Sequence, residues 1–441
     1  MRSRFVRIAP NEVAIADPEA LKTIYSAHSG FVKTDFYLPF RASWGRYADA
    51  FTNLDERQHM ERRRIVNKLY SMSNIVSLES GIDKCIEELT RKLNQCAHTE
   101  DCIDLASWVQ WYAFDVIGQL FFSHPFGFLE HAHDHAGYIR ALDLVVPLIA
   151  VACVMPAYIR PVFLLVGILV PRISKAMRAL KHIEHASEAC VVERQQLHNN
   201  IVADKHAPTD MLESFFAIVR KREERADFGS TEVKMEVYGA FIAGSDTTAA
   251  AITAILYYLL RNPPAYEKLT AEIDEAVEAG LLSPVIQYHE AIGLDYLSAC
   301  CKEGMRLHPS VGMTLPRHVP AGGAVISGEW FPGGTRVGVN AAVVQRSQSI
   351  FGENPDDFKP ERWLGAGAAK MERYMFQFGA GSRTCIGKNI SLCEMYKAIP
   401  QLLRQFQLEL VKAEWETRNY WFNKPAKVHV RVRPRKCGHA L

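Results

Sequence analysis

The sequence has no excess of charge of either sign. Its 51 lysines and arginines nearly balance 49 aspartates and glutamates, which gives a formal net charge of +2. Proteins that bind nucleic acid usually carry a marked basic surplus, because they neutralise phosphates. The balance therefore predicts no nucleic-acid partner, while a hydrophobic content of 48% is typical of a globular protein with a large core.

A long uninterrupted hydrophobic run is also absent. The opening MRSRFVRIAP contains neither the apolar core of a signal peptide nor the roughly 18 apolar residues of a membrane anchor. We therefore expect no signal and no anchor at this end. The most apolar stretch, residues 144–170, is interrupted by Pro147, Pro156, Arg160 and Pro161. It predicts a pair of short helices, buried or lying on the surface, and it allows shallow peripheral contact with a membrane.

Paired CxxC spacings are missing, although the chain has ten cysteines. Scattered single cysteines are typical of a reducing compartment, where most of them are small buried hydrophobic residues. Fixed-period repeats and long Gly, Ser or Pro linkers are missing too, so no boundary divides the chain. We expect a single domain that spans residues 1–441.

Most of the remaining pattern is helical. Good helix formers with apolar residues at i, i+3 and i+4 spacing fill much of the first third, as in CIEELTRKL, residues 85–93. An apolar helix is predicted from Thr231 to Arg261, where Pro263 and Pro264 end it. At the usual rise per residue this helix would be about 45 Å long, enough to cross the molecule.

Strand-like pieces are fewer and concentrate in the last third. Beyond Pro309, short β-prone segments bounded by Gly and Pro predict small hairpins. The segment VHVRVRP, residues 428–434, alternates apolar and charged side chains, which predicts a half-exposed edge strand. The expected fold class is therefore mainly α with a minor β region.

One cysteine stands in surroundings that suit metal binding. Cys385 lies in FQFGAGSRTCIG, residues 376–387. A cysteine binds iron only as its thiolate, which backbone N–H donors in a tight turn and nearby positive charge stabilise. The glycines of this segment permit such a turn, Arg383 supplies the charge, and the helix-prone stretch that follows directs its N-terminal dipole towards the anion.

Two other interpretations of the glycines remain open. The segment could be a Gly-rich loop around an ordinary buried cysteine. GAGS, residues 379–382, could also begin a dinucleotide-binding loop, but the third glycine and a surrounding βαβ pattern are missing. GAGAAK, residues 365–370, likewise lacks the full spacing of a phosphate-binding loop.

Asp246 lies in the middle of the predicted apolar helix, in AGSDTT, residues 243–248. A buried carboxylate is costly unless it is paired or hydrated. Activation of dioxygen in a dry pocket would give it a reason, because that chemistry needs a proton relay and a hydroxyl beside the reacting oxygen. Asp246 and Thr247 suit these roles. The alternative is a helix bent by Ser245, Asp246 and Thr248 side chains that bond back to preceding carbonyls.

These two segments resemble the signatures of the cytochrome P-450 family. Residues 378–387 match the ligand pattern F-x-x-G-x-R-x-C-x-G, and residues 243–248 match [A/G]-G-x-[D/E]-T-[T/S]. The resemblance implies a heme b cofactor (iron protoporphyrin IX) with Cys385 as its axial thiolate, and dioxygen as a substrate. It also implies that Phe378 packs against the sulfur and heme, that Arg383 meets a propionate, that Gly387 completes the ligand loop, and that Asp246 and Thr247 are the distal acid and alcohol.

A charge cluster extends the resemblance. Glu303 and Arg306 share a helix face and can pair. On a surface such a pair contributes under about 1 kcal/mol. The family's E-x-x-R and P-E-R-[F/W] elements are similar to KEGMR and PERW in this chain, which implies a buried triad of Glu303, Arg306 and Arg362. Its role would be folding and heme retention; the alternative is an ordinary exposed ion pair.

Three further heme contacts are implied by weaker matches. Arg317 stands where the family offers Arg or His to a propionate, with His318 as a substitute. His59 and Arg63 stand at the W-x-x-x-R spacing of an early helix, with His59 in place of the tryptophan.

Two polar runs are expected on the surface. In EHAHDHAG, His131 and His135 would align on a helix while His133 would point away, so we expect a polar surface turn, with a zinc site as the alternative. A charge run such as residues 61–64 usually forms a solvated helix face, and for Arg62 and Arg64, beside the predicted heme contact at position 63, this interpretation is left open.

The resemblance covers about residues 50–390 and implies a cytochrome P-450 fold whose long helix crosses the heme. The chain looks most like fungal microsomal members, many of which work in secondary metabolism or detoxification. A monooxygenase acting on a lipophilic small molecule is implied, with electrons from NADPH through a separate NADPH–cytochrome reductase and with cytochrome b5 as a further donor. The alternatives are a heme-thiolate isomerase, dehydratase or peroxide-using enzyme, and a non-catalytic heme-binding protein.

Fungal microsomal members lie on the cytosolic face of the endoplasmic reticulum. Because no anchor is found in this chain, a cytoplasmic location is the alternative. The absence of an anchor segment from this sequence also leaves the first strands of the β region in question. The specificity-bearing segments, roughly residues 30–60, 125–215 and 310–318, carry no readable code beyond an apolar content that predicts a lipophilic substrate.

Overall fold

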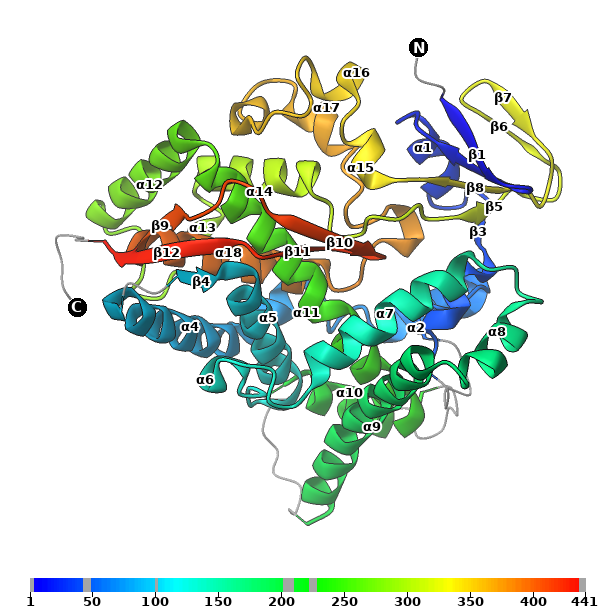
Figure 1. Cartoon of the computed structure of the whole chain (residues 1–441), viewed down its shortest axis with the longest axis horizontal. Helices are drawn as coiled ribbons and strands as arrows, with labels where there is room; N and C mark the ends of the chain where they lie inside the picture. The colour runs from blue at the N-terminus through cyan, green and yellow to red at the C-terminus, as the bar shows by residue number, and fades with distance from the viewer. Residues whose placement is uncertain (1–3, 43–48, 100–101, 201–209, 222–227, 436–441) are drawn as a thin grey trace.

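The fold was examined in a computed structural model that describes residues 4–42, 49–99, 102–200, 210–221 and 228–435, the side chains of 197–200 excepted. Cys437 and parts of the first two specificity-bearing segments lie outside these ranges. Helices dominate and the strands form several short sheets, so the prediction of a mainly α fold is confirmed (Figure 1). Helices not treated individually below are α1 (Ala20–Tyr25), η1 (Asp35–Phe40), α3 (Met72–Ser77), α4 (Glu79–Thr99), α6 (Phe128–His131), α9 (Pro171–Asn200), α10 (Met211–Lys221), α12 (Pro263–Glu278), α13 (Tyr288–Ala291), α15 (Ala341–Val344), α16 (Gln348–Phe351), η2 (Pro360–Trp363), α17 (Ala368–Glu372) and η3 (Gly381–Arg383).

The long helix α11 runs from Ser230 to Leu260 through the middle of the molecule (Figure 1). Its bounds agree with the predicted helix within one residue at each end. The Glu232 carboxylate accepts the Gly229 backbone N–H at 2.7 Å, which caps the first turn. The helix packs against α5 (Leu105–Phe122), α14 (Asp295–Leu307) and α18 (Lys388–Gln405). Within the described residues, α11 is the single helix long and apolar enough to cross a membrane, but 72% of its most apolar window is buried, as in a core helix.

A five-stranded sheet at one side of the molecule contains the first strands of the chain. Its order is β1 (Phe5–Ala9), β2 (Glu12–Ile15), β8 (Arg336–Val339), β5 (Arg317–His318) and β3 (Val32–Lys33). β2 and β8 are parallel and the other pairs are antiparallel. The question left open about the first strands is therefore settled: β1 pairs with β2, and β2 pairs with β8, a strand more than 300 residues away. β6 (Ala324–Ile326) and β7 (Glu329–Phe331) form one of the predicted hairpins.

The prediction of an edge strand at residues 428–434 is wrong. β12 (His429–Pro434) is the central strand of a three-stranded sheet, between β4 (Cys102–Asp104) and β9 (Phe406–Leu410). Its alternating exposure arises because one face of the sheet packs on the core, not because one edge is free. β10 (Glu416–Tyr420) and β11 (Phe422–Ala426) form a separate hairpin beside α11.

The apolar stretch at residues 144–170 forms the predicted pair of helices. α7 (Tyr138–Val154) is largely buried, whereas α8 (Arg160–Gly167) lies at the surface. Pro147 was expected to interrupt the stretch but lies inside α7, since a single proline removes only one helical hydrogen bond. Pro156 does lie between the two helices.

Candidate functional site

The loop that carries Cys385 joins η3 to α18, and two left-handed glycines shape it. Gly379 and Gly381 have φ of +69° and +63°, a region that glycine adopts without a steric penalty. A Cβ atom at Gly381 would lie 2.0 Å from the backbone oxygen of Tyr25, so the loop also presses against α1. The Cys385 backbone N–H donates to the oxygen of Phe378 at 2.8 Å, which closes the turn.

The Cys385 side chain is accessible to solvent and lines the cavity described below. Burial raises the pKa of this thiol, while the backbone N–H groups of Gly387 and Lys388 and the charge of Arg63 act in the opposite direction. These donors and this charge are the features predicted to stabilise a thiolate. The dinucleotide-loop interpretation of residues 379–382 is wrong, because no strand leads into this turn.

A cavity of about 310 Å³ separates the Cys385 loop from α11. Phe378, Cys385 and Gly387 line one side, and Ala243 and Thr247 of α11 also line it. The sequence-predicted residues that line the cavity are His59, Arg63, Thr247, Arg317, Phe378, Arg383, Cys385 and Gly387. Most of the predicted site residues, which are up to 328 positions apart (His59 to Gly387), are thus gathered around one space.

Thr247 and Asp246 face different surroundings. The Thr247 hydroxyl lines the cavity and donates to the carbonyl of Ala243 at 2.7 Å, one helical turn back. The Thr247 carbonyl accepts the Ser310 hydroxyl at 2.7 Å. The alternative of helix-bending hydrogen bonds from Ser245, Asp246 and Thr248 is not supported, since Ser245 has no partner in the described part of the chain and Asp246 bonds outside its own helix.

Asp246 belongs to a buried charge network behind α11. Its carboxylate accepts a hydrogen bond from Gln110 of α5 and lies 3.6 Å from the Lys424 ammonium of β11. Lys424 also pairs with Asp143 of α7 at 2.7 Å. Burial raises the pKa of Asp246, and the Lys424 charge partly opposes that shift.

One end of the cavity is strongly cationic. Arg63 of α2 (Glu56–Val66) donates to the carbonyl of Thr384 in the Cys385 loop at 2.7 Å. Arg317 of β5 donates to the Tyr37 hydroxyl at 2.6 Å and is 5% exposed. Buried His59 has a ring Nδ1 without a hydrogen-bond partner among the described residues. Burial, with the surrounding cations, lowers the pKa of His59 to about 3, so this imidazole is neutral.

Arg383 is the cation of this end that already holds a carboxylate. Its guanidinium makes a bidentate contact with Glu56, with Nη2 to Oε1 at 2.7 Å and Nε to Oε2 at 3.1 Å. His318, proposed as a substitute for Arg317, instead contacts the Gly334 carbonyl with its Nδ1 at 3.3 Å. Neighbouring residues of a strand point to opposite faces, so only one of the two can reach the cavity.

These features fit a flat, dianionic cofactor with a metal centre. The thiol would supply a ligand to the metal, the arginines would supply counter-charges, and the unpartnered Nδ1 of His59 would supply a polar contact. The described residues contain no group of three or more His, Cys, Asp or Glu side chains that could hold a metal ion by itself, so a metal at this thiol would need further ligands from its cofactor.

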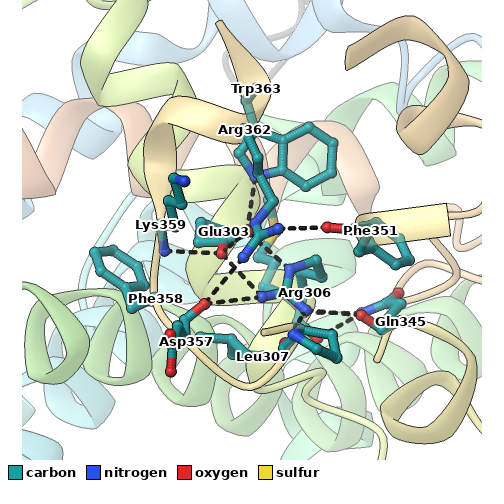
Figure 2. Close-up of polar contacts among 12 residues, drawn as sticks. Glu303, Arg306, Leu307, Gln345, Phe351, Asp357, Phe358, Lys359, Arg362 and Trp363 are labelled. Atoms are coloured by element: carbon teal, nitrogen blue, oxygen red, sulfur yellow. Dashed lines mark hydrogen bonds and ion pairs between the residues drawn. The ribbon is translucent and has the colours of Figure 1, made fainter. Parts of the chain in front are cut away.

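Glu303 and both arginines of the predicted triad meet where α14 packs against η2 (Figure 2). The Glu303 carboxylate lies 2.8 Å from Arg306 Nε and 2.7 Å from Arg362 Nε. It also accepts the Trp363 indole N–H and the Lys359 backbone N–H, each at 2.9 Å. Glu303 and Arg306 are fully buried, which excludes the alternative of an exposed ion pair.

Two surface predictions have different outcomes. The rings of His131 and His135 lie 4.5 Å apart at an exposed turn after α6, and the described residues offer no metal site there. Arg64 is exposed as expected. The solvated-face interpretation does not hold for Arg62, which is 7% exposed and lies 3.8 Å from Glu232 of α11. An arginine run cannot reveal that an acid 170 positions later meets one of its members.

Several residues of the cavity were missed by sequence reasoning. Lys33 and Tyr37 line its cationic end, and Trp421 packs among the rings of Phe40 and Phe51. No local pattern identifies them, because their roles depend on contacts between segments remote in sequence.

Comparison with known proteins agrees with this geometry. A family model described as Cytochrome P450 matches residues 8–428. The chain is 40% identical to the cytochrome P450 monooxygenase gsfF of Penicillium aethiopicum, over 97% of this chain and 85% of the relative. It is 35% identical to a pisatin demethylase of Fusarium vanettenii, over 98% and 82% of the two chains. Its fold is similar to that of the cytochrome P450DA heme domain, with a TM-score of 0.80 at 17% identity over 99% of this chain and 91% of that one.

Proposed function

Because this chain belongs to the cytochrome P450 family and is a monooxygenase of that family, we propose that Cys385 is the axial thiolate of its heme iron. We further propose that the enzyme inserts one atom of dioxygen into a lipophilic small molecule. The observation that carries the proposal is that the Cys385 thiol and the Thr247 hydroxyl line the same cavity. Bound heme supplies the chemistry that activates dioxygen.

Residues on the α11 side of the cavity take part in proton transfer. The Thr247 hydroxyl is anchored to the Ala243 carbonyl and keeps its oxygen available as an acceptor at the cavity wall. Asp246 stands directly behind it, linked to Lys424 and Gln110. Because burial raises the pKa of this carboxyl, it keeps its proton to higher pH than an exposed aspartate does, which suits a proton donor.

The remaining predicted residues hold the cofactor. Arg63, Arg317 and Arg383 offer positive charge to the heme carboxylates, and neutral His59 offers a ring nitrogen. The proximal loop rests on a scaffold that the Glu303 triad holds together. This division leaves Thr247 at the cavity wall, and Asp246 behind it, as the residues of the proton relay.

The substrate class follows from the rest of the cavity wall. The lining includes the apolar side chains of Ile117, Phe121, Ile242, Met313 and Trp421, which favour a lipophilic molecule. Fungal relatives named as cytochrome P450 monooxygenases and as a pisatin demethylase support a role in secondary metabolism or detoxification. Electrons come from NADPH through a separate reductase, with cytochrome b5 as a further donor.

The test is the spectrum of the reduced carbonyl adduct. The heme-loaded protein is expected to show the strongly red-shifted absorption of a trans thiolate. Cys385→Ser is expected to lose it while Cys102→Ser, at an exposed cysteine of β4, keeps it. A red-shifted band that survives in Cys385→Ser would contradict the assignment. A second assay then adds a reductase and a compound that converts the heme iron to high spin. An enzyme is expected to consume NADPH and dioxygen under these conditions, whereas a non-catalytic heme-binding protein is not.

A peripheral membrane contact through residues 144–170 also forms part of the proposal. α8 and the turns beside it expose a cluster of large apolar side chains that includes Tyr158 at 79%, Leu165 at 69% and Leu169 at 82%. Such a surface is unusual on a protein that meets only water, and the cytosolic face of the endoplasmic reticulum would cover it.

The membrane contact is tested by flotation with phospholipid vesicles. Replacing Leu165 and Leu169 together by serine is expected to release most of the protein from the vesicles. Leu281→Ser is the matched control, since Leu281 is 66% exposed on another part of the surface. Equal flotation of the double variant and the unsubstituted protein would contradict membrane contact at α8 and favour a cytoplasmic location.

A further inference from the structure

Lys33 is a buried lysine in the wall of the cavity. It lies at the end of β3 and is 5% exposed. Its ammonium donates to the carbonyl of Phe51 at 2.5 Å and lies 4.1 Å and 4.2 Å from the ring centres of Tyr37 and Phe51. One backbone carbonyl and two aromatic faces leave donor capacity unused, because an ammonium has three N–H groups.

The other deeply buried lysine of the described chain shows what Lys33 lacks. Lys397 of α18 is fully buried, and its ammonium pairs with Glu79 at 2.5 Å and with Asp83 at 2.7 Å. Lys33 has no carboxylate within 4.0 Å among the residues that the structure describes. A buried charge is costly unless an opposite charge compensates it. The charge of Lys397 is compensated in this way, whereas the charge of Lys33 is not.

The surroundings of Lys33 make the imbalance larger. Burial lowers its pKa well below the ordinary range, and the charges of Arg317 and Arg383 lower it further. The negative charges of Asp49 and Glu56 act in the opposite direction and raise the pKa of Lys33. Both acids are engaged elsewhere, however: Asp49 accepts the Phe51 and Thr52 backbone N–H groups at 2.7 Å and 2.8 Å, and Glu56 holds Arg383.

This end of the cavity therefore contains three cations without a carboxylate partner in the described part of the chain: Lys33, Arg63 and Arg317. We propose that Lys33 binds a carboxylate of the heme and helps to retain the cofactor. The inference rests on the proposed heme site and adds to it a residue outside the matched sequence patterns. A carboxylate of the cofactor would compensate the Lys33 charge and use its free N–H donors.

A purely structural role is the competing explanation. Lys33 could serve only to tie β3 to the segment around Phe51, which forms part of the cavity wall. The two roles differ in one respect: only the first depends on charge on the heme. Heme dimethyl ester has the same ring and iron but neutral side chains, so it removes the proposed partner without changing the protein.

The experiment measures the rate of heme loss to excess apomyoglobin. Protein reconstituted with heme or with heme dimethyl ester is compared for the unsubstituted chain, Lys33→Met, Lys33→Arg and Lys397→Met. With heme, Lys33→Met is expected to lose its cofactor about tenfold faster or more, since a charge-assisted hydrogen bond contributes about 1.5–3 kcal/mol. Lys33→Arg should remain within about threefold of the unsubstituted protein, because it keeps the charge.

With the dimethyl ester, Lys33→Met and the unsubstituted chain should lose cofactor at the same rate. Lys397→Met should accelerate the loss of both cofactors equally, because it weakens the protein and not a propionate contact. If Lys33→Met behaves like Lys397→Met, or does not change the rates at all, the proposal is overturned. A missing red-shifted carbonyl band in the unsubstituted protein would instead overturn the thiolate assignment, and it leaves the comparison of rates interpretable.

If Lys33→Met takes up neither cofactor, lysine labelling of the unsubstituted protein tests the proposal instead. The protein is labelled as apoprotein and after loading with each of the two cofactors. Reductive methylation followed by mass spectrometry reports how accessible each lysine amine is. Heme should protect Lys33 more strongly than heme dimethyl ester does. Equal protection by the two cofactors would overturn the proposal.

Discussion

The ammonium of Lys424 lies 3.6 Å from the carboxylate of Asp246, although the two residues come from β11 and α11. This contact ties the acid of the proposed proton relay to the hairpin at the end of the chain. It also sets the proton affinity of that acid, because burial raises the pKa of Asp246 and the Lys424 charge counteracts the rise.

Replacement of Lys424 by methionine should therefore raise the pKa of Asp246 further. The measurement is the pH dependence of turnover, in which Asp246→Asn identifies the kinetic pKa that belongs to Asp246 by abolishing it. We expect that pKa to move to higher pH in Lys424→Met. Lys427→Met is the control, since Lys427 pairs with Glu416 on the exposed side of the hairpin. A profile that is the same for Lys424→Met and the unsubstituted enzyme would show that Asp246 does not titrate during turnover.

The Glu303 triad predicts a large loss of stability from one substitution. Glu303→Gln leaves the buried charges of Arg306 and Arg362 without compensation, which should cost about 3 kcal/mol or more. Glu361→Gln is the control. Glu361 is two positions from Lys359 of the same cluster, but its side chain is 43% exposed and pairs with exposed Lys268. Thermal unfolding of the heme-loaded proteins should separate the two variants clearly. Equal midpoints would mean that the triad contributes no more than a surface pair.

Local signals explain which parts could be predicted from the sequence. The Cys385 loop combines left-handed glycines with a following helix, and α11 combines apolar residues with a proline stop, so both are legible within a dozen or so residues. The Glu303–Arg306 pair is legible for the same reason, since its members are one helical turn apart.

The features that could not be predicted from the sequence depend on contacts between remote segments. Lys33, Lys424 and buried Arg62 depend on partners on remote segments, and no short pattern encodes such meetings. The alternating pattern of β12 indicates which face of the strand is exposed but not which strands pair with it, so it cannot distinguish a central strand from an edge strand. Arg317 and His318 are adjacent, and only the orientation of β5 in its sheet decides which of them faces the cavity.

Glu236 makes stability depend on pH in a specific window. This carboxyl of α11 is 8% exposed, and burial raises its pKa from 4.5 to about 7, against the opposing charge of Arg62. Between these pH values the native chain keeps a proton that the unfolded chain releases, so stability falls as pH rises through the window. The full effect, present above pH 7, is about 3 kcal/mol.

Glu236→Gln removes this titration. Relative to the unsubstituted protein, its melting temperature should therefore rise progressively between pH 5 and pH 8. Glu278→Gln, at an exposed position of α12, should show a constant difference across the same range. A constant difference for Glu236→Gln as well would show that Glu236 is ionised at all these pH values.

Gly381 combines two constraints that a methyl group would violate together. Its φ of +63° is strained for any residue with a side chain, and the added Cβ would lie 2.0 Å from the Tyr25 backbone oxygen. Backbone on both sides leaves no flexible group to move aside, so Gly381→Ala should displace the loop that positions Cys385. We expect heme content after expression to fall several-fold. Gly365→Ala should keep normal heme content, because nothing lies within 4 Å of an added Cβ there and its φ is ordinary. Normal heme content and an unchanged carbonyl spectrum in Gly381→Ala would mean that the loop tolerates displacement and that Cys385 is positioned mainly by α18.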